Sequence, residues 1–182
     1  LPGMTVVVSP LLALMRQQAE RLLARGVAAT WLGTDVAPAD RAHRLRAVAR
    51  GDVRVLLASP EALGNGDTLD VLRARGVSLL CVDEAHVLPS WGAAFRPDYA
   101  RLGAVAAALC PAVTLALTAT ATRETQEAIM AGLGLATAQV VVMPPARDNV
   151  ALRVEIAPGA GDDLAGRIAE VLQAERGSTG RF

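Results

Sequence analysis

The sequence predicts an α/β domain built on a parallel sheet, and three observations support this fold class. Short apolar runs alternate along the chain with longer segments of helical periodicity, which is typical of repeated strand–helix units. The run Leu79–Val82 is apolar throughout, as expected of a strand that is buried on both faces of a parallel sheet. The dipeptide Ser-Pro follows two expected strands, at residues 9–10 and 59–60, where helices would begin.

The expected strands are runs of Val, Leu and Ile bounded by Gly, Pro, Asp or Ser. We expect them at residues 5–8, 27–32, 53–58, 79–82, 113–117, 139–142 and 150–156. The expected helices begin at capping residues or prolines, and most stop near glycines. We expect them at residues 10–25, 38–50, 69–75, 98–109, 122–131 and 163–175. Residues 64–68 and 87–97 should form loops, and in 87–97 a Gly and two Pro disfavour regular structure.

Composition limits the classes of protein to which the chain can belong. The formal net charge is zero, so any contact with nucleic acid must be local rather than driven by a global field. The two cysteines, Cys81 and Cys110, show neither metal spacing nor a disulfide framework, which favours a reducing, cytoplasmic setting. No apolar run approaches the length of a membrane span, and we expect no membrane association.

Lysine is absent from the chain, since all eighteen basic residues are arginine. A phosphate-binding P-loop needs a glycine-rich turn followed by Lys and Ser or Thr, so this chain contains none. The sequence also opens at a Pro-Gly turn without a Met. We therefore expect these residues to be a fragment of a longer protein.

Two adjacent acids, Asp83 and Glu84, end the apolar run Leu79–Val82. Open α/β sheets bind ligands at the carboxyl ends of their strands, and neighbouring carboxylates there repel each other unless a cation shares the space. Mg²⁺ is bound through one or two carboxylates together with substrate phosphates. The pattern has the form of a Walker B element, with Asp83 on the metal and Glu84 orienting the attacking water. An acidic helix cap is the alternative.

Other polar residues at strand ends have two interpretations each. The helix starts at Ser9–Pro10 and Ser59–Pro60 offer free N–H groups to phosphates, or are ordinary caps. The hydroxyls around Thr118 and Thr120 could bridge two sites, or cap the following helix. The loop with Trp91, Phe95 and Arg96 concentrates the few aromatics of the chain, and could stack bases or be pinned to the core. The arginines of the second helix are expected on a solvated face; they are Arg41, Arg44, Arg46 and Arg50.

Taken together, the residues resemble the RecQ family of superfamily 2 DNA helicases, which carry a DEAH box. Asp83-Glu84-Ala85-His86 is similar to helicase motif II, and the segment from Trp91 to Tyr99 is similar to the aromatic-rich loop typical of this family. The other matching segments follow the order of the family. They are Thr5–Leu11, Ser59–Glu61, Leu117–Ala121 and Arg147–Asn149.

The resemblance implies a RecA-like P-loop NTPase domain, a parallel sheet flanked by helices, that lacks its first strand and its Walker A segment. Residues 1–143 would form that domain, 144–149 a linker, and 150–182 the beginning of a second RecA-like domain. ATP would bind between two such domains, and its hydrolysis would drive 3′–5′ unwinding. The isolated fragment should be inactive.

The resemblance also implies roles for individual residues of the ATP site. Asp83 would hold Mg²⁺ and Glu84 would be the catalytic base. His86 would couple the ATP site to the DNA site, and Thr118 and Thr120 would link hydrolysis to domain movement.

For DNA, the resemblance implies contacts with single strands and duplex junctions. Ser9–Pro10 and Ser59–Pro60 would lie near the DNA backbone, while Trp91, Phe95 and Arg96 would sense single-stranded DNA. The implied processes are DNA repair and recombination.

Three departures from the family pattern concern polar groups. Pro89-Ser90 stands where relatives usually have Ser-Gln, Ala93-Ala94 replaces two polar residues, and Ala62 replaces an Arg. These changes suggest weaker stimulation of ATP hydrolysis by DNA. The alternatives to a helicase are a nucleic-acid-binding or scaffolding module that has lost its ATPase, and another superfamily 2 ATPase such as a DEAH-type RNA helicase.

Overall fold

A computed structural model describes residues 3–91 and 97–143, together with residues 166, 169 and 173. Within these residues, the five strands form one parallel sheet in the order β2-β3-β1-β4-β5. They are β1 (Met4–Val8), β2 (Ala29–Leu32), β3 (Val55–Ala58), β4 (Val77–Val82) and β5 (Val113–Ala116). The predicted fold class is confirmed, and β4, which precedes the two acids, lies between β1 and β5.

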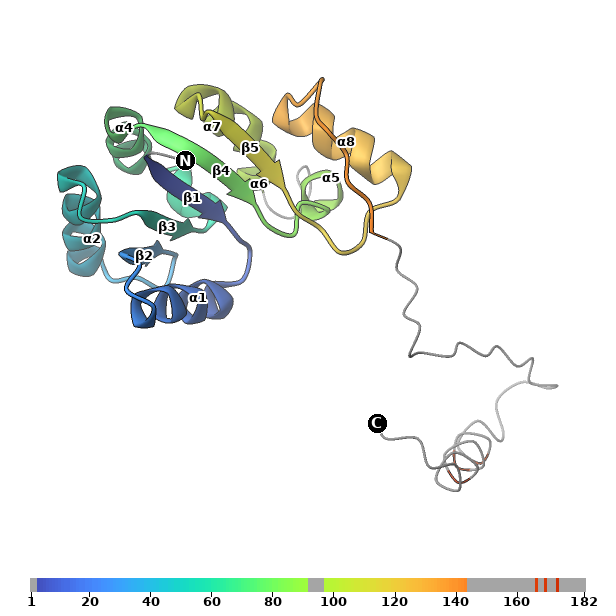
Figure 1. Cartoon of the computed structure of the whole chain (residues 1–182), viewed down its shortest axis with the longest axis horizontal. Coiled ribbons are helices and arrows are strands. Elements are labelled where there is room, and N and C mark those ends of the chain that lie inside the picture. Colours follow the sequence, from blue (N-terminus) through green and yellow to red (C-terminus); the bar gives the residue numbers. More distant parts are fainter. Residues whose placement is uncertain (1–2, 92–96, 144–165, 167–168, 170–172, 174–182) are drawn as a thin grey trace. The chain divides into compact units, whose positions relative to one another are not determined.

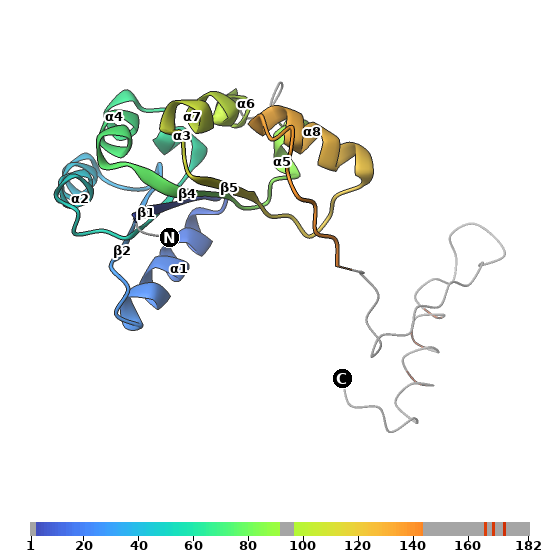
Figure 2. The ribbon, with the colours of Figure 1, turned by 45° about the horizontal axis from the view of Figure 1, so that its top comes forward.

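Helices cover the two faces of the sheet unequally (Figures 1 and 2). On one face, α1 (Leu12–Ala24) packs Met15 and Ala19 against Leu57 of β3. The helices on the other face are α2 (Pro38–Arg50), α3 (Pro60–Leu63), α4 (Gly66–Arg75), α6 (Pro97–Ala100) and α7 (Leu102–Leu109). Two more helices, α5 (Val87–Trp91) and α8 (Arg123–Leu133), lie near β5. As a result, Val113 and Leu115 are exposed on the α1 face of β5, and Leu117 is exposed directly after the strand.

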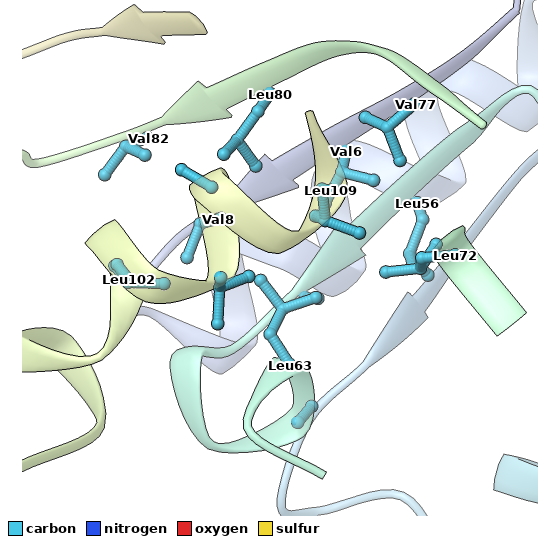
Figure 3. Close-up of a cluster of buried hydrophobic side chains, with 14 of the residues drawn as sticks. Val6, Val8, Leu56, Leu63, Leu72, Val77, Leu80, Val82, Leu102 and Leu109 are labelled. Atoms are coloured by element: carbon cyan, nitrogen blue, oxygen red, sulfur yellow. The ribbon is translucent and has the colours of Figure 1, made fainter. Parts of the chain in front are cut away.

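The main core lies between the sheet and the helices α3, α4 and α7 (Figure 3). Val6, Val8 and Leu80 of the central strands are fully buried there, against Leu63 of α3 and Leu102 of α7. Alternate residues of β1 enter this core, which fixes the register of the strand. The core thereby holds the carboxyl ends of β1, β3 and β4 in fixed positions.

The predicted start of the first helix is wrong. The amide of Ser9 still donates to the carbonyl of Ala58, at 3.2 Å, so strand-like pairing continues past β1. The helix α1 begins at Leu12, and its N-cap position is occupied by Leu11, which makes no side-chain cap. Ser9 is therefore not the cap that the Ser-Pro pattern predicts.

Three other segments differ from the prediction, and two of them contain more helix than the sequence predicts. The loop expected at 64–68 is shorter, because Asn65 caps α4 through its side chain and the helix begins at Gly66. The irregular segment expected at 87–97 begins with the helix α5, and residues 92–96 lie outside the described residues. The helix expected at 98–109 is divided into α6 and α7.

The strand expected at 139–142 is absent from the described structure. Residues 139–143 have no regular secondary structure, and the side chains of Val140–Met143 are exposed. The prediction followed from the high β-propensity of consecutive valines, but a strand forms only with a partner and a surface to cover its side chains.

The chain divides into two compact units, Leu1–Gln139 and Val140–Phe182. In the second unit, Gly166, Ala169 and Gln173 are helical and fall within the helix expected at 163–175. The linker expected at 144–149 and the strand expected at 150–156 lie outside the described residues, so the predicted domain boundaries stay predictions. Among the helices of the described part, none is long and apolar enough to cross a membrane.

Two glycines at the contact between α7 and α8 should respond oppositely to a methyl group. A Cβ on Gly103 would lie 2.2 Å from the backbone carbonyl oxygen of Gly132, whereas a Cβ on Gly132 would meet no atom within 4 Å. We expect Gly103→Ala to destabilise the fold by about 1–3 kcal/mol through overpacking. Gly132→Ala should stabilise it by about 0.5 kcal/mol, because it reduces the entropy of the unfolded chain. Thermal unfolding of the two variants, measured side by side, tests this opposite sign.

Candidate nucleotide and nucleic-acid site

The predicted site residues of four strands meet at the carboxyl edge of the sheet. The amides of Ser59, Ser9 and Asp83 each donate to the carbonyl of the last residue of the neighbouring strand, at 2.9, 3.2 and 2.8 Å. These bonds extend the β-ladder by one residue beyond β3, β1 and β4. They align both Ser-Pro turns and the acid pair along one edge, which is where ligands bind in open α/β sheets.

The chain around the acid pair is bracketed by one residue that follows β5. The amide of Leu117 donates to the carbonyl of Val82, and the carbonyl of Leu117 accepts from the amide of Ala85, both at 2.8 Å. Asp83 and Glu84 occupy the short segment between these two bonds. Their backbone position therefore depends on β5, which has a strand neighbour on one side only within the described residues.

Glu84 has an unusual backbone conformation. Its φ is 50°, in the left-handed region that residues other than Gly seldom adopt, and its amide donates to Oδ1 of Asp83 at 3.0 Å. Such strained conformations persist where the surrounding structure holds them, and they cluster at functional sites. Both carboxylate side chains are partly exposed, so they are accessible to a ligand.

His86 connects the acid pair to the threonines after β5. Its Nδ1 atom lies 3.3 Å from Oε2 of Glu84 and 3.1 Å from Oγ1 of Thr118. The same Thr118 hydroxyl accepts from the amide of Thr120, at 3.2 Å. The side chains of His86 and Glu84 are about one-third exposed, so their direct contact contributes little stability. Because His86 contacts both residues, its ring connects the Glu84 carboxylate to the Thr118 hydroxyl.

The carboxylates at this edge suit a cation that takes its remaining ligands from phosphates and water. In the described part of the chain, no group of three or more His, Cys, Asp or Glu side chains could hold a metal ion. One Asp83 oxygen accepts from the Glu84 amide, which leaves the other for a cation. Oxygen ligands from one or two carboxylates, completed by phosphates and water, suit Mg²⁺. The thiol of Cys81 does not compete, because burial, and then the charge of Asp83, raise its pKa and keep it protonated.

The two Ser-Pro turns lie along the same edge of the sheet as the acid pair, but the serine hydroxyls are not on the surface. The Ser59 side chain is buried and accepts from the Ala62 amide at 3.2 Å, so it caps α3. Ser9 is also fully buried, and its hydroxyl has no hydrogen-bond partner in the described structure. Pro10 is partly exposed and Pro60 is buried. Their contacts with a DNA backbone stay predictions, and a contact made through the Ser9 or Ser59 hydroxyl requires local movement.

Trp91 is the last residue of α5, which begins three residues after Glu84. Nothing is described of its side chain, and Phe95 and Arg96 lie outside the described residues. Their predicted role in sensing single-stranded DNA therefore stays a prediction.

Two of the arginines expected on a solvated face are instead partly buried. Arg44 stacks over the Trp31 ring, 3.8 Å from its centroid, and donates to the Trp31 carbonyl at 2.8 Å. Arg41 donates to the hydroxyl of Thr68 and to the carbonyl of Ala62. Helical periodicity could not distinguish these two from Arg46 and Arg50, which are exposed as expected.

In the comparison with known proteins, the matching family and the similar relatives are all described as helicases. The model of the family described as DEAD/DEAH box helicase matches residues 2–129. A probable ATP-dependent DNA helicase RecS of Bacillus subtilis is 41% identical over 95% of this chain and 34% of its own length. ATP-dependent DNA helicase Q5 of Rattus norvegicus is 42% identical over 73% of this chain and 14% of its own length. ATP-dependent DNA helicase RecQ of Pasteurella multocida is 32% identical over 81% of this chain and 23% of its own length.

The fold is similar to that of solved helicase structures. The helicase Lhr of Mycobacterium smegmatis, bound to single-stranded DNA and AMP-PNP, superposes with a TM-score of 0.56 at 22% identity, over 94% of this chain and 25% of that one. A hypothetical ATP-dependent RNA helicase of Sulfolobus tokodaii gives a TM-score of 0.54 at 20% identity, over 72% of this chain and 38% of that one. These likenesses show the fold. The chain spans about a third or less of the length of the curated relatives described above.

Proposed function

Because the chain belongs to the DEAD/DEAH box helicase family, we propose that it is part of an ATP-dependent DNA helicase that couples ATP hydrolysis to 3′–5′ unwinding. Within that family the chain is of the RecQ type, since RecS and RecQ relatives are 31–41% identical to it over most of its length. The observation that best supports ATP hydrolysis is the acid pair that Leu117 brackets at the carboxyl edge of the sheet.

In the proposed reaction, the residues of this edge prepare water for attack on the terminal phosphate of ATP. Glu84 orients the water and accepts its proton as the oxygen attacks phosphorus and ADP leaves. Asp83 holds Mg²⁺, which neutralises charge on the phosphates when it is bound. His86, which lies between Glu84 and Thr118, links this step to movement of the segment after β5 that contains Thr118 and Thr120.

The phosphate cradle must come from outside these 182 residues, because they contain no lysine. Within the described residues, one edge of β5 has no strand neighbour, and this edge is the place where a further strand with a P-loop would pair. The exposed side chains of Val113, Leu115 and Leu117 support a further helix that follows this strand and covers the same face, since both faces of a parallel sheet are normally covered by helices.

We propose DNA single strands and duplex junctions as the substrates, DNA repair or recombination as the process, and the cytoplasm as the location. DNA helicases among the relatives support the substrate class. Cys81 and Cys110 are both free, which is compatible with a reducing compartment.

Strand displacement by the intact protein tests the unwinding activity and its polarity. We expect ATP-dependent unwinding of a duplex with a 3′ overhang, and the absence of ATP-dependent displacement would exclude a helicase.

The second candidate is a nucleic-acid-binding or scaffolding module that has lost its ATPase, and the absence of lysine favours it. The residues encoded immediately before Leu1 distinguish the two candidates. A Gly-Lys-Ser or Gly-Lys-Thr sequence there supports the helicase, whereas an intact upstream region without it supports the binding module.

Replacing Trp91 or Phe95 by Ala should uncouple ATP hydrolysis from DNA in the intact protein. If each side chain stacks on a base, its removal costs about 1–3 kcal/mol per base, so stimulation by single-stranded DNA should fall about 5- to 150-fold. Hydrolysis without DNA should stay within about twofold of wild type, because the acid pair is retained. ATPase assays over a range of DNA concentrations test this. Stimulation that remains unchanged in both variants would exclude a sensing role.

A further inference from the structure

Arg41 connects three helices next to the Ser59–Pro60 turn, which we define as residues 59–60. Its Nη2 atom donates from α2 to the hydroxyl of Thr68 in α4 and, at 3.4 Å, to the carbonyl of Ala62 in α3. We propose that Arg41 is a positioning residue that holds the Ser59–Pro60 turn in the geometry required for DNA. This inference rests on the proposed function, in which that turn lies near the DNA backbone.

The helix α3 needs an external partner because it has only four residues. Its last carbonyl groups have no turn of helix beyond them, and so short a helix is not stable by itself. Ala62 is only 4% exposed, so water has little access to its carbonyl. A guanidinium donor satisfies such a carbonyl at the end of a helix, and it also complements the negative end of the helix dipole.

The contact of Arg41 is transmitted directly to the Ser59–Pro60 turn. Ala62, whose carbonyl accepts from Arg41, donates its amide to the Ser59 hydroxyl at 3.2 Å. Ser59 in turn donates its own amide to the carbonyl of Leu32. Arg41 and Ser59 therefore hold Ala62 from its two sides, and losing the Arg41 contact frees the C-terminal end of the short helix that Ser59 caps.

Thr68 fixes the other end of this connection. Its side chain is fully buried, and the Arg41 guanidinium is its hydrogen-bond donor. Because α4 starts two residues before Thr68, the guanidinium spans the junction between α3 and α4. The guanidinium fork reaches both acceptors at once, which a lysine ammonium on a flexible stem does less well.

Arg44 provides a matched control on the same helix. It lies three residues after Arg41 and is also partly buried, but it packs on Trp31 of β2. Replacing either arginine by Met keeps an apolar stem and removes the donors. Only Arg41→Met removes a contact with α3.

The first experiment measures ATP hydrolysis by the intact protein as a function of single-stranded DNA concentration. We expect Arg41→Met and Thr68→Val to raise the DNA concentration for half-maximal stimulation about tenfold, and to leave the rate at saturating DNA within about twofold. Arg41→Lys should give a smaller shift. Arg44→Met should stay within about twofold of wild type in both quantities. An unchanged half-saturation concentration in Arg41→Met, or an equal shift in Arg44→Met, would overturn the inference.

A second measurement separates this inference from the proposed function. Amide hydrogen exchange of Leu63, Gly64 and Leu69, whose amides bond within the α3–α4 segment, reports its local opening without ATP or DNA. Arg41→Met should accelerate exchange there at least about tenfold more than Arg44→Met does. If wild type shows no DNA stimulation, the proposed function fails, and exchange alone then decides whether Arg41 positions the turn. Equal exchange in the two variants would overturn that role.

Discussion

We expect Glu84→Gln to slow ATP hydrolysis by the intact protein by about 10²- to 10⁴-fold, the usual contribution of a general base. Gln has the same shape but cannot accept a proton from water at neutral pH. Glu84 lies between the two hydrogen bonds of Leu117, and its amide contacts Asp83, so the backbone should keep its position in the variant. Phosphate release under saturating ATP, with and without DNA, gives the two rates to compare.

The control for this variant is Glu20→Gln, which makes the same chemical change on α1 at an exposed position. Its surface pairing with Arg16, at 4.0 Å, contributes little, so its rate should match wild type. If Glu84→Gln also hydrolyses ATP within about twofold of wild type, Glu84 is not the base. Weak hydrolysis in both wild type and the variant would support the binding module instead.

The geometry of Glu84 shows why part of the site could not be predicted from sequence. A four-residue apolar run before two acids was sufficient to place both at the carboxyl edge of a parallel sheet, and they lie there. The left-handed φ of Glu84 could not be predicted, because Glu seldom adopts it and the Leu117 bonds that flank this segment come from a residue distant in the sequence. His86 and Thr118 are 32 residues apart and become neighbours only through the pairing of β4 with β5.

The two Ser-Pro dipeptides show that a local pattern does not fix where the following helix starts. Ser59 caps α3 as the pattern predicts, whereas α1 begins three residues after Ser9. Figure 2 shows that α1 and α3 lie on opposite faces of the sheet, so the same local signal is followed by two different chain paths. Ser-Pro thus predicts that the chain turns out of a strand, and tertiary packing decides how soon the helix starts. In contrast, Pro38 and Gly51 marked both ends of α2 correctly, because each acts through its own backbone geometry.

The two partly buried arginines of α2 were also not predictable from local sequence. Arg41 and Arg44 occur in a strongly polar helix, where a solvated face is the usual interpretation. Their partners Thr68 and Trp31 come from other elements, and no spacing within α2 indicates them. A structural role for an arginine becomes visible only when a buried carbonyl or hydroxyl nearby needs a donor.

The largest effect we expect is a complete loss, since residues 1–182 alone should show no ATP hydrolysis above background. Asp83 and Glu84 are in place at the edge of the sheet, but hydrolysis also needs amides and a lysine to hold the phosphates. No lysine exists in this chain, and among the described residues no arginine forms an ion pair or a hydrogen bond with either acid. Phosphate release by the purified chain with Mg²⁺ and ATP, compared with that of the intact protein, measures the difference.

Glu84→Gln in the isolated chain is the control that distinguishes hydrolysis by this chain from hydrolysis by a contaminating ATPase. A trace of contaminating ATPase would give the same rate in both preparations, because the contaminant does not carry the substitution. Turnover that disappears in Glu84→Gln would instead come from this chain, and would contradict the requirement for a separate phosphate cradle. In that case the amides at the carboxyl edge, together with an arginine, would have to bind the phosphates of ATP. Equal background rates in the two preparations, combined with activity of the intact protein, would place the missing cradle outside these residues.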